Sequence, residues 1–216
     1  MTRSQRIAAL KAAAKERVLI LDGSWGVMFQ KRGLSEDDYR GERFKDHVGQ
    51  MKGNNDILCL TRPDIVADLH DQYYAAGADI SETNTFSSTS IGQGEYGREA
   101  DVRDINLAAA GIARAVADRW TEKEPDKPRF VAGSIGPLPV MLSMSSDVND
   151  PGARKVTFEQ VYTAYAEQVR ALHDGGVDLF LIETITDTLN CKAAIKAILD
   201  LEAEGLEPLP IWISGT

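Results

Sequence analysis

The stretch Asp178-Leu179-Phe180-Leu181-Ile182-Glu183-Thr184 decides how this chain folds. Its apolar residues follow one another without a break, which is typical of a parallel β-strand that is buried on both faces. The run stops at Glu183, so the pattern places a carboxylate at the carboxyl end of a buried strand. A helical pattern that ends at Gly175-Gly176 precedes the strand, and a second helical pattern follows it. This alternation predicts an α/β fold with a parallel sheet.

Further apolar runs repeat this arrangement along the chain. We predict strands over residues 17–22, 78–83, 130–133, 178–183 and 211–213. Small or polar residues follow each run, and amphipathic helical patterns lie between most of them. A (β/α)8 barrel builds its active site from the carboxyl ends of its strands, so this layout indicates an enzyme. The predicted fold is a TIM barrel, present here as an N-terminal portion with about five of its eight strands.

The length of the chain supports this prediction of a partial barrel. An eight-stranded barrel normally needs about 250 residues, whereas this chain has 216 and ends on Ser214-Gly215-Thr216, directly after a predicted strand. We therefore expect residues 1–216 to form one truncated domain. The outer strands, 17–22 and 211–213, would then expose unpaired edges, and the fragment is expected to self-associate through them.

The predicted helices have recognisable starts. The helix over 63–76 begins with proline and stops before glycine. Later helices are expected to begin after Asp101, at a capping box formed by Thr157 and Gln160, and after Asp187.

Residues 23–61 do not fit the alternation of helix and strand. The segment is rich in glycine and contains the charged run Ser35-Glu36-Asp37-Asp38. Connections of this length are usually functional, and since this one follows the first predicted strand, we expect an active-site loop. Residues 56–60 are expected to add a short strand outside the barrel.

The composition excludes several classes of function. The formal net charge of −9 disfavours binding to nucleic acid or to anionic membranes, which select basic surfaces. No apolar stretch reaches the roughly 18 residues needed to cross a bilayer. The first fifteen residues fit an amphipathic helix better than a transit peptide. We therefore expect a cytoplasmic protein without nucleic-acid or membrane partners.

No metal site is predicted within the chain. Cys59 and Cys191 lie in apolar patterns and are expected in the core. His47, His70 and His173 fall in different predicted elements, so they do not form a ligand pattern.

Polar residues at the strand ends are the candidates for ligand binding. Glu183 needs a partner because an unpaired buried charge is costly, and that partner is either a ligand ammonium group or an internal Arg or Lys. Glu82 and Asn84 carry the same argument more weakly. Asp22, beside glycines, either approaches a ligand or caps a turn. The segment Ser134-Ile135-Gly136-Pro137 either offers backbone N–H groups to an anion or forms a plain turn.

A set of characteristic segments runs in order along nearly the whole chain: Leu21-Asp22-Gly23, Arg40-Gly41-Glu42-Arg43-Phe44, Lys52-Gly53-Asn54-Asn55-Asp56, Gly77-Ala78-Asp79-Ile80, Glu82-Thr83-Asn84-Thr85-Phe86, Asp147-Val148-Asn149-Asp150-Pro151, Glu183-Thr184, Asp187-Thr188-Leu189-Asn190 and Ile213-Ser214-Gly215-Thr216. Together these segments resemble the homocysteine-binding module of cobalamin-dependent methionine synthase. The arginine–glycine and asparagine segments distinguish methionine synthase from other homocysteine methyltransferases. The resemblance implies a TIM barrel of the homocysteine S-methyltransferase type.

The resemblance also implies which residues bind substrate. Asp22 and Glu183 match the acids that hold the amino group of homocysteine, and the backbone at Gly23 and Ser24 matches the segment that closes around the amino acid. The chain departs from the family pattern at Ser24, which is usually glycine or alanine, and at Leu138-Pro139, which is often Thr-Asn. The expected substrate-binding residues are Asp22, Gly23, Ser24, Asn84, Thr85, Ser134, Glu183 and Thr184.

Zinc and methylcobalamin are the cofactors that the resemblance implies. In this family three cysteines hold zinc, one at the end of a later strand and two in a Gly-Gly-Cys-Cys-Gly motif. Neither motif is present, so the zinc ligands are expected beyond residue 216 and the fragment alone is expected to be inactive. Zinc deprotonates a bound thiol, and the thiolate attacks a methyl group. The methyl group would come from methylcobalamin on another module, so cobalamin- and folate-binding modules are expected partners, in the same or a separate chain.

Two alternatives to a methionine synthase remain at this point. One is a homocysteine methyltransferase that uses S-methylmethionine or betaine as the methyl donor. The other is a non-catalytic partial barrel that acts as an interaction module through its open edges.

Overall fold

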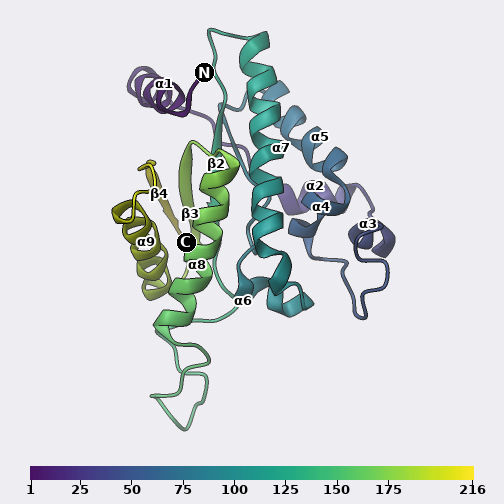
Figure 1. Cartoon of the computed structure of the whole chain (residues 1–216), viewed down its shortest axis with the longest axis vertical. Coiled ribbons are helices and arrows are strands. Elements are labelled where there is room, and N and C mark those ends of the chain that lie inside the picture. Colours follow the sequence, from purple (N-terminus) through teal and green to yellow (C-terminus); the bar gives the residue numbers. More distant parts are fainter.

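A parallel four-stranded sheet organises the computed structural model, which describes all residues from Met1 to Thr216. The strands are β1 (Ile80–Glu82), β2 (Phe130–Ile135), β3 (Leu179–Ile185) and β4 (Ile211–Gly215), and they pair in chain order. Helices connect successive strands, as Figure 1 shows. The predicted fold class, an α/β fold with the parallel strands and crossover helices of a partial barrel, is confirmed.

Helices cover one face of the sheet and also occupy the connections. They are α1 (Arg3–Glu16), α2 (Trp25–Lys31), α3 (Glu36–Arg40), α4 (Leu58–Thr61), α5 (Pro63–Ala75), α6 (Ser90–Gln93), α7 (Val102–Lys123), α8 (Phe158–Gly175) and α9 (Thr188–Ala203). Figure 1 shows α7, α8 and α9 beside the strands, and the long β2–α8 connection extending away from the other elements. The largest apolar cluster lies between the sheet and these three helices. No helix combines the length and apolar content needed to span a membrane.

The predicted strand over 17–22 lies beside β1 but pairs with it through a single parallel bridge, Leu21 to Ile80. The backbone N–H of Asp22 donates to the carbonyl of Ile80 at 3.0 Å, which fixes the end of the segment against the sheet. Val18 is 81% exposed, because no other strand pairs with the segment on its outer side. The predicted position beside the sheet is thus confirmed, but the segment does not form a regular strand, and the expected burial is wrong at Val18 and at Ile20, which is 54% exposed.

Residues 23–61 contain more regular structure than their sequence predicts. They contain α2, α3 and α4, and the predicted strand over 56–60 is wrong, because these residues form a 3₁₀ turn that leads into α4. A short apolar run fits a buried helix as well as a strand, so its packing partners decide. Here Ile57, Leu58 and Cys59 pack in a cluster that includes Ile105 of α7.

The predicted helix starts are confirmed except at one residue. Thr157 accepts the backbone N–H of Gln160 at 3.2 Å in a capping box, and the Asp187 carboxylate accepts N–H groups of the first turn of α9. Asp101 forms no such cap on α7. Its carboxylate instead accepts a hydrogen bond from Arg43 at 2.7 Å, because an ion pair with the preceding segment is within reach.

Candidate functional site

Strand alternation selects the residues of the candidate site, because successive side chains of a strand point to opposite faces. One face of the sheet packs against α7, α8 and α9. The other face forms an apolar layer with Leu10 of α1, and its members from the strands are Ile80, Phe130, Ala132, Leu179 and Leu181. Two positions beyond this layer, the same face presents Glu82, Ser134 and Glu183. Polar side chains are therefore gathered at the carboxyl ends of three adjacent strands.

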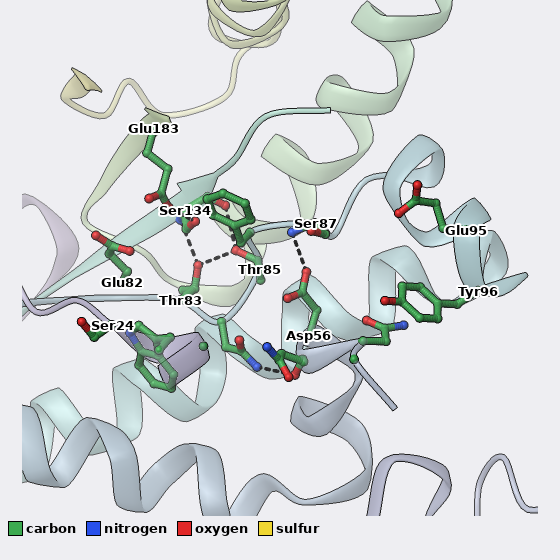
Figure 2. A pocket seen from close by; sticks show the side chains of 17 residues that line it. Ser24, Asp56, Glu82, Thr83, Thr85, Ser87, Glu95, Tyr96, Ser134 and Glu183 are labelled. Atoms are coloured by element: carbon green, nitrogen blue, oxygen red, sulfur yellow. Dashed lines mark hydrogen bonds between the residues drawn. The ribbon is translucent and has the colours of Figure 1, made fainter. Parts of the chain in front are cut away.

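These side chains border a cavity of about 390 Å³, shown from close by in Figure 2. Of the predicted substrate-binding residues, the ones that line it are Ser24, Asn84, Thr85, Ser134 and Glu183. Asp22, Gly23 and Thr184 do not line it. The structure therefore brings most of the predicted residues to one cavity. Gly23 and Thr184 are chain neighbours of the lining residues Ser24 and Glu183, and Asp22 is hydrogen-bonded to the backbone of Glu82.

Asp22 lies behind Glu82 and is bonded to it through the backbone. Its Oδ1 accepts the backbone N–H of Glu82 at 3.0 Å, and its Oδ2 accepts Trp25 Nε1–H at 3.2 Å and the hydroxyl of Ser81. Since Ser81 donates to Asp22, His70 Nδ1 must donate to Ser81, at 2.6 Å. The carboxylate of Asp22 is thus oriented by donors from neighbouring segments.

Glu183 is oriented by its neighbours in the sheet. The hydroxyl of Ser134 donates to Glu183 Oε1. Thr184 adopts a left-handed conformation with φ 55°, which is costly for a β-branched residue, and the β3–β4 register breaks between Ile182 and Ile185. The distortion of β3 therefore begins at the residue that directly follows Glu183, where the strand reaches the cavity.

Ser134 is itself fixed by two threonines that follow β1. Thr85 Oγ1 donates to the carbonyl of Ser134 at 2.7 Å, and Thr83 Oγ1 accepts the Ser134 N–H at 2.9 Å. Thr85 has only one hydroxyl hydrogen, so Thr83 is the donor in the 2.7 Å bond between the two hydroxyl groups. Figure 2 shows this chain of hydrogen bonds in the wall of the cavity. The predicted residues Thr85 and Ser134 therefore shape the wall together.

The acidic groups of the site resist ionisation. Burial raises the pKa of Asp22 to about 6, although the hydrogen bonds from Ser81, Glu82 and Trp25 oppose this rise. Burial also raises the pKa of Glu82, and the nearby carboxyl groups of Glu183 and Asp22 raise it further. The pKa of Glu183 is raised by burial and held back by the hydrogen bond from the Ser134 hydroxyl. Three carboxyl groups thus share a small space that is poorly solvated.

The structure adds residues to the site that the sequence alone did not indicate. Glu82 is only a weaker candidate in the sequence, because the sequence of one strand does not show which face of the sheet its side chain points to. Asn54 and Asp56 line the cavity although they belong to a helical connection, and Tyr96 reaches it from the segment after α6. The 52–56 segment contributes to the resemblance, which could have identified Asn54 and Asp56. No local signal marks Tyr96.

Asp56 provides a test of burial in this wall. It is 4% exposed and accepts hydrogen bonds from the Ser87 N–H and the Ser88 hydroxyl, both at 2.7 Å. Burial raises its pKa to about 6, so the folded protein binds the proton more tightly than the unfolded chain does. The resulting stabilisation is present below pH 4 and is lost as the pH rises through 6. It corresponds to about 3 kcal/mol.

We expect Asp56→Asn to remove this pH dependence. The wild type should lose about 3 kcal/mol of unfolding free energy relative to the variant between pH 4 and pH 7. Urea unfolding of both proteins at several pH values measures the difference. Asp187→Asn is the control of opposite sign: although burial alone would raise the pKa of Asp187, backbone N–H donors lower it below its ordinary value. If the difference in unfolding free energy between wild type and Asp56→Asn did not change with pH, the prediction would be contradicted.

The chain holds no arrangement suited to a metal ion. No group of three or more His, Cys, Asp or Glu side chains is placed to ligate one. Cys59 and Cys191 are both buried and unpaired, as predicted for core residues, and burial raises the pKa of each thiol. The residues present therefore do not fit the zinc site that the resemblance implies.

Solved structures of a homocysteine methyltransferase have a similar fold. The chain superimposes on the oxidized form of the homocysteine methyltransferase MmuM from Escherichia coli with a TM-score of 0.71 and 22% identity, over 95% of this chain and 64% of MmuM. The metallated form of MmuM has the same TM-score and identity, with 65% of its chain covered. The apo form aligns with a TM-score of 0.61 and 18% identity, over 96% of this chain and 62% of MmuM. The chain therefore spans less than two thirds of the length of these relatives.

The sequence itself matches a family model over almost all of its length. Residues 19–216 match the model described as homocysteine S-methyltransferase. The matched range includes every strand of the sheet and all the residues that surround the cavity. The chain belongs to the homocysteine S-methyltransferase family.

Proposed function

We propose that this chain binds homocysteine by its amino group, so that the thiol can be methylated to give methionine. The observation that carries the proposal is the group of carboxyls formed by Asp22, Glu82 and Glu183. The charged groups close enough to shift these three are themselves acidic. A buried cluster of acids without an internal cation is suited to a ligand that brings one.

The proposed role of each group follows from its orientation. Glu183, held by Ser134, accepts N–H donors of the ammonium group from inside the cavity. Asp22 supports the same charge from behind the wall, where Ser81 and Trp25 restrain it. We assign Gly23 and Ser24 to the segment that closes around the amino acid, as the resemblance implies. A cavity of about 390 Å³ suits a small amino acid.

We further propose that the chain is the first part of a barrel in a methionine synthase. The segments 40–44 and 52–56 favour methylcobalamin as the methyl donor, with cobalamin- and folate-binding modules as partners. The shorter length of this chain relative to MmuM supports a contribution from further strands. If zinc activates the thiol, its ligands lie outside these residues, because the side chains present do not form a metal site.

Methyl transfer to homocysteine tests this function in the full-length protein. Methionine formation is measured with methylcobalamin, S-methylmethionine and betaine in separate reactions. We expect turnover with methylcobalamin. Turnover only with S-methylmethionine or betaine would contradict the methionine synthase assignment. The protein would then be a homocysteine methyltransferase that uses one of these methyl donors. A folded protein that neither binds homocysteine nor forms methionine would favour a non-catalytic interaction module.

A further inference from the structure

Glu82 and Glu183 form a carboxyl pair across the cavity wall. Glu82 ends β1, Glu183 lies near the end of β3, and Ser134 of β2 lies between them. Figure 2 shows both side chains on the same side of the cavity, with their carboxyl groups toward each other. Ser134 donates to Glu183, and both glutamates line the cavity. Two neighbouring carboxyl groups in a poorly solvated site disfavour each other's ionisation, so one of them carries a proton.

The surroundings assign this proton to Glu82. Glu183 already accepts a hydrogen bond from Ser134, which favours its ionised form. Glu82 has no hydroxyl donor of its own, and its neighbours Asp22 and Glu183 disfavour a further negative charge. Glu82 is therefore the carboxyl group that carries the proton, and Glu183 is the ionised one.

No nearby group can neutralise a doubly ionised pair in the ligand-free protein. Tyr73 of α5 is neutral, because burial and the nearby carboxyl groups of Asp22 and Glu82 raise its pKa. His70, also from α5, is neutral because burial lowers its pKa to about 3. Asp56 is itself acidic, and the charge of Glu183 contributes to the rise of its pKa, so it cannot neutralise the pair. The proton on Glu82 is the remaining source of compensating charge.

We propose that the ammonium group of the ligand displaces this proton, so that Glu82 is a further substrate-binding residue and binding is coupled to proton release. The inference rests on the proposed function, since homocysteine supplies the cation. The O–H bond of Glu82 breaks, its proton passes through the cavity to the solvent, and an N–H of the ammonium group donates to the carboxylate that is formed. No other bond is made or broken.

This exchange has a measurable consequence for affinity. Because the complex holds one proton fewer than its separated components, homocysteine should bind more tightly as the pH rises. The dissociation constant should fall by up to about tenfold per pH unit below the pH at which free Glu82 ionises. The same coupling favours a cationic amine over a neutral analogue.

Calorimetry in the full-length protein measures the released proton. Titrations of homocysteine at pH 7 in two buffers with different ionisation enthalpies give the number of protons released per ligand. The thiol can release a proton of its own, but it does so in wild type and Glu82→Gln alike. The amide introduced by Glu82→Gln has the size of the protonated carboxyl group but no proton to lose. We expect the wild type to release about one proton more than the variant.

A second comparison uses only the wild type, in case Glu82→Gln does not fold. The probe 4-mercaptobutyrate has the thiol and carboxylate of homocysteine but no amino group. Homocysteine should release about one proton more than this probe. Equal proton counts in both comparisons would overturn the proton exchange while leaving homocysteine binding intact. Absence of homocysteine binding to the folded wild type would instead overturn the proposed function.

Discussion

Glu183→Gln is expected to weaken homocysteine binding by about 10- to 100-fold, the largest effect of any single change in the cavity. The variant keeps the size of the side chain and can still accept a hydrogen bond from Ser134. It loses the negative charge that we assign to the ammonium group. A hydrogen bond to a charged partner contributes about 1.5–3 kcal/mol, which corresponds to this loss of affinity. Isothermal calorimetry with the full-length protein measures it.

Glu95→Gln is the matched control for this experiment. Glu95 lines the same cavity, but Figure 2 shows it on the side opposite Glu183. The change removes one negative charge from the cavity without touching the carboxyl group of Asp22, Glu82 or Glu183. We expect its affinity for homocysteine to stay within about twofold of wild type. Equal losses in both variants would show that general charge, rather than a contact at Glu183, determines the affinity.

Asp178→Ala is expected to destabilise the fold by about 3–5 kcal/mol, the largest effect outside the cavity. Asp178 precedes β3, and its side chain is fully buried. It accepts hydrogen bonds from Arg6 and Arg114, both at 2.6 Å, and from the Val131 N–H at 2.9 Å. Alanine would leave the charge of Arg6, which is 11% exposed, without an acidic partner. Thermal and urea unfolding of the full-length protein measure the change.

Asp174→Ala provides the comparison, because it removes an ion pair of the same chemistry at the surface. Asp174 pairs with Arg103 at 3.3 Å, and their side chains are 40% and 59% exposed. Exposed pairs contribute about 0–1 kcal/mol, so this variant should unfold nearly as the wild type does. A similar small effect for Asp178→Ala would mean that the buried arginines find other partners.

The strands and their order along the chain were predictable because buried parallel strands require uninterrupted apolar runs. The runs at 78–83, 130–133, 178–183 and 211–213 all correspond to strands of the sheet. The run at 56–60 did not, since apolar content alone does not distinguish a strand from a short buried helix. Packing against α7 decided that case. Asp101 differed for a related reason: an arginine distant in sequence competed for its carboxylate.

Local apolar periodicity was enough to predict the class of fold and the end of the sheet at which polar groups gather, because it is a property of each segment alone. Glu183 was identifiable as a site candidate from its own strand. That Glu82 faces Glu183 across Ser134, with Asp22 behind them, emerged only when the chain was folded. Those relations depend on strand register and on the left-handed turn at Thr184, which arise from contacts between segments far apart in the chain.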